Sequence, residues 1–111
     1  QKIEFAAKIG ADRIELYTEN YAKEYQLNKQ ASVIPYVNAS KVAMDNGLGV
    51  NAGHDLDLNN LEFFAKSVNG LLEVSIGHAL ISDAIYMGLE NSVQRYLYQL
   101  ELANKWKSNN S

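Results

Sequence analysis

Two short apolar segments, each ending in glycine and histidine, constrain the fold of this chain more than any other feature. The first is Leu-Gly-Val-Asn-Ala-Gly-His, residues 48–54, and the second is Leu-Glu-Val-Ser-Ile-Gly-His, residues 72–78. A helix-like run follows each segment. This alternation of strands and helices predicts a parallel sheet covered by helices. Because ligands collect at the carboxyl ends of such strands, His54 and His78 are expected to belong to a site.

The first half of the chain contains two further predicted elements and one unassigned stretch. Apolar spacing predicts a helix over residues 3–10 that stops at Gly10, and alternation predicts a strand over 13–17. Residues 19–30 are polar, contain tyrosines and lack an apolar period, so we expect a long loop that either binds a ligand or is disordered. The next helix is expected to hold Pro35 in its first turn and to end near Asn46, before Gly47.

The second half repeats the strand–helix order. Strands are predicted at 49–51 and 71–76. Asp57 is the expected N-cap of the helix between them, with Asn59 and Glu62 as an alternative capping box. A short helix over 79–87 should break at Gly88, a long helix should begin near residue 90, and the polar tail from residue 107 should be frayed.

The composition narrows the class of protein. The 111 residues are expected to form a single domain, with a net charge of −3, which argues against nucleic acid or an anionic membrane as the main partner. There is no cysteine, and no apolar run approaches the roughly 20 residues of a membrane span. Residues 1–9 form an amphipathic pattern, not a signal peptide, so the cytoplasm is the expected location.

Three strands are too few to close a barrel. They therefore predict either a small open sheet or the last part of a (β/α)₈ TIM barrel, and the short extra helix after the last strand favours the barrel. Because the chain opens at Gln1 inside a helix-like run, we expect it to be a fragment of a longer protein whose N-terminal part lies outside this sequence.

Three segments resemble one known family, pyridoxine 5′-phosphate synthase. They are Gly-Ala-Asp-Arg-Ile-Glu-Leu-Tyr-Thr (10–18), Gly-Leu-Gly-Val-Asn-Ala-Gly-His-Asp-Leu (47–56) and Ile-Gly-His-Ala-Leu-Ile-Ser-Asp-Ala-Ile-Tyr-Met-Gly-Leu (76–89). The resemblance covers nearly the whole chain and is weakest over residues 19–46. It implies the C-terminal half of a TIM barrel that forms homo-oligomers, up to octamers.

The resemblance also implies an activity. The family condenses 1-deoxy-D-xylulose 5-phosphate with 3-amino-2-oxopropyl phosphate, giving pyridoxine 5′-phosphate, phosphate and water without a cofactor or metal. Its motifs place the proton donor at His54 and a transition-state-stabilising carboxylate at Glu15. They place contacts with the amino-ketone phosphate at Asp55, Gly77 and His78. Some members have glycine where this chain has Asp55, whose carboxylate would repel a phosphate if it pointed inward.

Simpler interpretations of these residues remain open at this level. Each histidine could be a structural hydrogen bonder, and Gly77 could serve only a tight turn. Glu15 should share a strand face with Arg13 and could form an internal salt bridge with it or with a basic residue outside this sequence. A metal site that combines the two histidines with Glu15 and Asp55 lacks any supporting spacing. Two other functions compete with the synthase: another phosphate-binding barrel isomerase or aldolase, and a non-enzymatic αβ module that binds a partner through its open edge.

Overall fold

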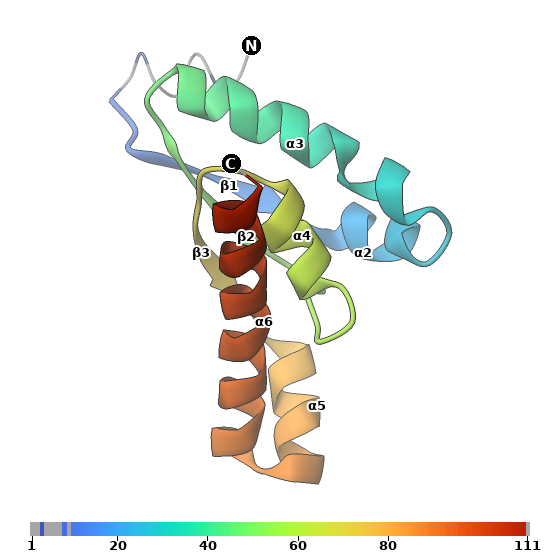
Figure 1. Cartoon of the computed structure of the whole chain (residues 1–111). Coiled ribbons are helices and arrows are strands. Elements are labelled where there is room, and N and C mark those ends of the chain that lie inside the picture. Colours follow the sequence, from blue (N-terminus) through green and yellow to red (C-terminus); the bar gives the residue numbers. More distant parts are fainter. Residues whose placement is uncertain (1–2, 4–7, 9, 111) are drawn as a thin grey trace.

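A three-stranded parallel sheet forms the centre of the molecule (Figure 1). The computed structural model describes residues 3, 8 and 10–110, so the helix expected over 3–10 lies largely outside the described residues. The strands are β1 (Arg13–Tyr17), β2 (Gly49–Gly53) and β3 (Leu71–Ser75), in the order β1-β2-β3. The α/β class and the three strand predictions are confirmed, although β2 is two residues longer and β3 one residue shorter than expected.

The two faces of this sheet have opposite character. One face is apolar and packs into the core through Ile14, Leu16, Val50, Ala52 and Val74. The other face is polar and exposed, and it carries Arg13, Glu15, Tyr17, Glu73 and Ser75. On this polar face the Arg13 guanidinium lies 3.0 Å from the Glu73 carboxylate and donates a hydrogen bond of 3.4 Å to Asn51 Oδ1. In the described part of the chain, the core therefore lies on one side of the sheet.

Residues 19–30 are not the long loop that the sequence predicted. They contain α2 (Glu19–Tyr25) and the start of α3 (Lys29–Asp45). Tyr21 and Tyr25 lie one turn apart on α2 and supply its missing apolar side: the Tyr21 ring is fully buried, 4.9 Å from the ring of Phe64. Their hydroxyls donate to the carbonyls of Asn60 and Asn59, so burial leaves no polar atom unpaired at either tyrosine.

Helix α3 begins six residues before Pro35, which corrects the prediction that this proline occupies the first turn. Asn28 is the N-cap, and its side chain accepts a hydrogen bond of 3.1 Å from Ala31 N–H. Pro35 therefore lies inside the helix, where it removes one backbone hydrogen bond. The helix ends at Asp45 and is followed by Gly47 at φ 74°, as predicted.

The cap of α4 (Leu61–Ser67) also differs from the prediction. Its N-cap is Asn60, not Asp57 or Asn59. Asp57 instead caps the turn before the helix, because its carboxylate accepts hydrogen bonds from the N–H groups of Asn59 and Asn60. Asn60 in turn accepts from Asp57 N–H at 2.9 Å, so the two side chains fix this turn reciprocally.

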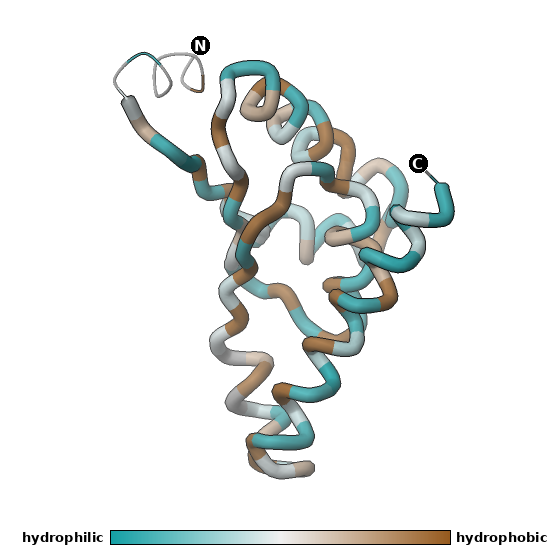
Figure 2. Tube along the Cα trace, turned by 60° about the vertical axis from the view of Figure 1, so that its left-hand side comes forward, coloured by the Kyte–Doolittle hydropathy of each residue, from teal (hydrophilic) through white to brown (hydrophobic). Residues whose placement is uncertain are grey.

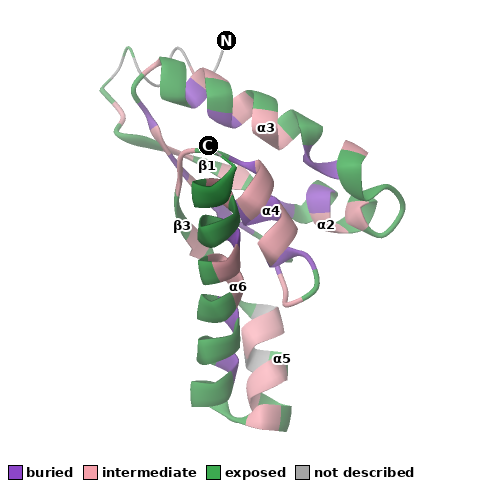
Figure 3. Cartoon of the chain, in the orientation of Figure 1, coloured by how far each residue is buried: buried purple, intermediate pink, exposed green. Residues whose placement is uncertain are grey.

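Two helices complete the chain and form a projecting antiparallel pair (Figure 1). They are α5 (His78–Met87) and α6 (Leu89–Asn109), separated by Gly88 at φ 83°. Helix α6 is the more hydrophilic of the two (Figure 2), and most of its residues are exposed (Figure 3). The tail is not frayed from residue 107: Lys107 Nζ donates a hydrogen bond of 2.8 Å to the Val68 carbonyl, and α6 continues to Asn109. None of the described helices is both long and apolar enough to cross a membrane.

Candidate active site

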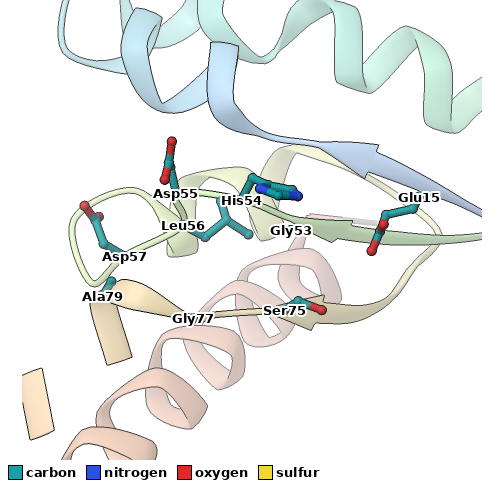
Figure 4. A pocket seen from close by; sticks show the side chains of 9 residues that line it. All are labelled: Glu15, Gly53, His54, Asp55, Leu56, Asp57, Ser75, Gly77 and Ala79. Carbon is teal, nitrogen blue, oxygen red and sulfur yellow. The ribbon is translucent and has the colours of Figure 1, made fainter. Parts of the chain in front are cut away.

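A cavity of about 470 Å³ opens at the carboxyl ends of the three strands (Figure 4). Nine residues line it: Glu15, Gly53, His54, Asp55, Leu56, Asp57, Ser75, Gly77 and Ala79. Four of the five residues that the sequence placed in a site, Glu15, His54, Asp55 and Gly77, are therefore brought together. The side chain of the fifth, His78, lies outside the described residues, although its backbone begins α5 directly after the cavity-lining Gly77.

Glu15 lies deeper in the cavity than His54. Tyr17 is level with Gly53 in the parallel ladder, and Glu15 lies two residues earlier on β1, which is roughly 6 to 7 Å along the strand. Arg13 is engaged by Glu73, and no hydrogen bond or ion pair of the Glu15 carboxylate is found within residues 10–110. The predicted salt bridge between Arg13 and Glu15 is therefore wrong, whereas a pair between Glu15 and a basic residue outside the described part of the chain stays a prediction.

The chain reverses sharply at the end of β2. His54 has φ 103° and Asp55 has φ 60°, a left-handed conformation that side-chain-bearing residues rarely adopt. Hydrogen bonds hold this geometry: the Thr18 hydroxyl donates to the His54 carbonyl, and Asn60 Nδ2 donates to the Asp55 carbonyl at 3.1 Å. Such strain persists where the surroundings fix it, and it is concentrated at functional sites.

The last residue of β1 and the two residues after it contact His54. Glu19 Oε1 lies 3.6 Å from His54 Nδ1, and the Tyr17 ring packs edge-on against the imidazole with 5.1 Å between centroids. Thr18, between them, is fully buried. Sequence reasoning missed these three residues as parts of the site. Their position at the carboxyl end of β1 could have identified them from the sequence, because parallel strands deliver their carboxyl ends to one edge of the sheet.

Tyr36 of α3 holds the connection between β1 and α2 in place through two hydrogen bonds. Its hydroxyl accepts a hydrogen bond of 3.2 Å from Tyr21 N–H and donates one of 3.0 Å to the Tyr17 carbonyl. Burial raises the pKa of the Tyr36 hydroxyl above its ordinary value, and burial does the same to the pKa of Tyr21. Both tyrosines therefore remain protonated donors at neutral pH.

Two glycines of the cavity, Gly53 and Gly77, have different surroundings. A Cβ at Gly53 would lie 2.9 Å from Ser75 Cβ and 3.3 Å from the Ser75 carbonyl, so the close approach of β2 and β3 demands glycine. Gly77 has φ −105°, and a Cβ there would meet no atom within 4 Å. Neither a clash nor a positive φ explains glycine at position 77, but its ψ of −89° lies outside the main helical and extended regions, so the tight-turn interpretation stays open beside the ligand one.

Asp55 points away from the part of the cavity formed by Ser75 and Gly77 (Figure 4). It also lines a second hollow beside α2. This orientation removes the objection that its carboxylate would repel a phosphate held near Gly77. Among the residues that the structure describes, the lining of the main cavity nevertheless contains three carboxylates, from Glu15, Asp55 and Asp57, and no lysine or arginine. In the part of the chain that the structure describes, no group of three or more histidine or acidic residues is arranged to hold a metal ion.

The chain matches a known protein family over most of its length. The family model described as "Pyridoxal phosphate biosynthesis protein PdxJ" matches residues 1–102. The chain belongs to the PdxJ family. The resemblance read from the three sequence segments is thereby confirmed.

Curated relatives of this PdxJ-family chain carry one name, pyridoxine 5′-phosphate synthase. The Flavobacterium johnsoniae protein is 55% identical over 101 residues, which cover 91% of this chain and 43% of that protein. The Bacteroides thetaiotaomicron protein is 57% identical over 96 residues, covering 86% of this chain and 40% of the relative. The Porphyromonas gingivalis protein is 58% identical over 100 residues, covering 90% and 42%. The chain thus spans about two-fifths of the length of these relatives.

We expect Thr18→Val to destabilise the full-length protein by about 0.5–1.5 kcal/mol, because valine has nearly the same shape but cannot donate the hydrogen bond that the buried Thr18 hydroxyl gives to the His54 carbonyl. Thr18→Ser is the matched control, since it keeps the hydroxyl and loses only a methyl group. Urea unfolding of the three proteins measures the difference. A valine variant as stable as the serine variant would show that this hydrogen bond does not hold the turn.

Gly53→Ala should also destabilise the protein, by about 1–3 kcal/mol, because its methyl group overlaps Ser75. Combining it with Ser75→Gly removes the contact with Ser75 Cβ while leaving that with the carbonyl, so we expect partial recovery. Unfolding free energies of the two single variants and the double variant give the coupling. Strictly additive losses would contradict the clash.

Proposed function

We propose that the full-length protein is a pyridoxine 5′-phosphate synthase. It would condense 1-deoxy-D-xylulose 5-phosphate with 3-amino-2-oxopropyl phosphate to pyridoxine 5′-phosphate, phosphate and water. One observation carries the proposal: Glu15, His54 and Gly77 line a single cavity at the carboxyl ends of adjacent parallel strands. The family resemblance assigns the stabilising carboxylate to Glu15, the proton donor to His54 and a substrate contact to Gly77.

We infer that the sheet is part of a (β/α)₈ barrel. The apolar face of the strands packs into the helical core, while the polar face with Arg13, Glu15 and Glu73 is exposed in the described part of the chain. An open parallel sheet normally has helices on both faces, whereas a barrel closes its second face on itself. About three-fifths of the relatives' length lies outside the matched region, which is enough for the remaining βα units.

His54 has the chemistry that ring closure needs. Imidazole gives or takes a proton near neutral pH. When a hydroxyl leaves, the Nε2–H bond of the imidazolium breaks, a new O–H bond forms, the C–O bond breaks, and water departs. His54 lies at the rim of the cavity, where its ring reaches both the ligand space and solvent for reprotonation.

Glu15 and the start of α5 would act on other charges of the reaction. A carboxylate below the reacting carbons stabilises developing positive charge on a protonated imine or carbocation-like centre. Gly77 leaves room for an anion to approach the backbone, and the first N–H groups of the ten-residue helix α5 follow it. The Asp55 backbone and the His78 side chain are further proposed contacts of the amino-ketone phosphate.

The charge of the cavity bears on the origin of the phosphate ligands. Two phosphorylated substrates are not neutralised by the described part of the lining, which holds three carboxylates and no lysine or arginine. The cations that bind these phosphates would therefore come from the remaining βα units or from another protomer of a homo-oligomer, as large as an octamer. As the family resemblance implies, the reaction would need neither a metal nor a cofactor. The enzyme would act in the cytoplasm.

The test is to incubate the full-length protein with both phosphorylated substrates, and with each alone, and to follow pyridoxine 5′-phosphate by chromatography. Product should form only when both are present, with stoichiometric release of phosphate and no requirement for added metal. Consumption of either substrate alone would favour a barrel isomerase or aldolase. Binding without any conversion would favour the non-enzymatic module.

A further inference from the structure

The imidazole of His54 has one described polar partner, and that partner lies outside the cavity. Glu19 Oε1 is 3.6 Å from His54 Nδ1, and Glu19 is not among the residues that line the cavity. A histidine ring carries its two nitrogens on different edges, so engagement of Nδ1 by Glu19 leaves Nε2 as the nitrogen available to a ligand.

Several contacts fix Glu19 relative to His54. Thr18 N–H donates to the Gly53 carbonyl at 2.9 Å, and the Thr18 hydroxyl donates to the His54 carbonyl. The Tyr17 ring packs against the imidazole at an angle of 61° and restricts the rotation of the His54 side chain. Three successive residues thus contact His54 through its ring, its carbonyl and its Nδ1 edge.

We propose that Glu19 is a positioning residue that holds a proton on His54 Nδ1 and thereby makes Nε2 the nitrogen that exchanges a proton with the substrate. The proposal rests on the proposed function of His54. The proton leaves from Nε2 of the imidazolium, and the neutral ring that remains is the Nδ1–H tautomer, with that hydrogen directed at the Glu19 carboxylate. A carboxylate behind an imidazole has the same orienting effect in hydrolytic triads.

A structural role for Glu19 is the competing explanation. Glu19 is the first residue of α2, where a negative charge interacts favourably with the helix dipole. The pair itself adds little to folding stability, because 52% of the His54 side chain and 56% of the Glu19 side chain are exposed. Variants at position 19 should therefore fold, which allows tautomer and turnover to be compared directly.

The test combines nitrogen NMR of histidine-labelled full-length protein with steady-state kinetics. At alkaline pH, where histidine rings are neutral, His54 should be the Nδ1–H tautomer in the unsubstituted protein. In Glu19→Ala it should change to the Nε2–H tautomer that free histidine favours. Glu19→Gln should preserve the Nδ1–H form, because its amide oxygen is an acceptor that can take the place of the carboxylate oxygen 3.6 Å from Nδ1. The His54 signals are assigned from a His54→Asn sample.

The kinetic arm separates positioning from helix stability. Glu19→Ala should lower kcat roughly 10-fold with little change in KM, and Glu19→Gln should retain most of kcat. Adding Asn20→Asp to Glu19→Ala restores a negative charge in the first turn of α2 without restoring the carboxylate at His54 Nδ1, so it should not restore kcat. An unchanged tautomer in Glu19→Ala, or recovery of kcat by Asn20→Asp, would overturn the proposal.

The two arms also distinguish this proposal from the function on which it rests. If the unsubstituted protein forms no pyridoxine 5′-phosphate, the proposed function fails, and the tautomer measurement still shows whether Glu19 controls the proton on Nδ1. If product forms and the tautomer does not respond to position 19, only the role of Glu19 is refuted.

Discussion

Turnover of the full-length protein is expected to fall about 10²–10⁴-fold when His54 is replaced by asparagine, which is the range that general acid–base groups contribute. Asparagine is the informative substitution because it tolerates left-handed backbone better than most residues, and His54 has φ 103°. The fold should therefore survive while the titrating group is lost. Steady-state kinetics with both phosphorylated substrates, alongside circular dichroism, measure the two effects separately.

His78→Asn provides the matched comparison. As a proposed contact of the amino-ketone phosphate, His78 should affect mainly KM for that substrate, whereas His54 should affect kcat. Folded His54→Asn protein with a rate near that of the unsubstituted enzyme would refute the proton-donor role. A loss confined to KM would instead make His54 a binding residue.

Residues 1–111 expressed alone are expected to make no pyridoxine 5′-phosphate and to be either partly unfolded or associated. Strands β1 and β3 are both edges of the sheet, and unpaired edges promote association. The projecting helix pair also exposes large apolar side chains, namely Ile85, Tyr86, Leu89, Val93 and Leu97. In addition, the described lining of the cavity holds no lysine or arginine to bind two phosphates. Light scattering, thermal unfolding and the two-substrate assay measure each consequence.

A chimera is the control for this experiment. The 101 matched residues of the Flavobacterium johnsoniae relative are replaced by the corresponding part of this chain, so the same residues are tested with the remaining βα units present. The chimera should be active and the isolated segment inactive. A monomeric segment that melts cooperatively and turns over both substrates would contradict the barrel proposal, because three strands would then suffice.

Most of the sheet could be predicted from the sequence, and so could the meeting of four of the five proposed site residues in one cavity. Alternation defined β1, the Gly-His pairs marked the ends of β2 and β3, and Gly47 and Gly88 marked the ends of helices. These signals are local, since strand alternation and the positive φ that glycine permits depend only on neighbouring residues. The carboxyl ends of parallel strands then meet at one edge whatever the details of packing.

The errors occurred where distant contacts decide the structure. Helix α2 has no aliphatic residues at helical spacing that would predict it. It forms because the Tyr21 ring is buried against Phe64 and its hydroxyl donates a hydrogen bond to the carbonyl of Asn60, 39 residues away. The start of α4 moved from Asp57 to Asn60 because the two side chains cap one turn jointly. Position 107 was expected to fray, but its ammonium group binds the end of α4.

The sequence by itself determined the order of the strands, the order of the helices other than α2, and the residues delivered to the strand ends, because these follow from short-range spacing and backbone preference. Only the tertiary structure decided what surrounds the imidazole of His54. Tyr17, Thr18 and Glu19 lie more than 30 positions earlier in the chain, and their contacts exist because β1 and β2 pair in register and Tyr36 fastens the turn between β1 and α2. Side-chain geometry across a sheet depends on that pairing, which local preferences do not encode.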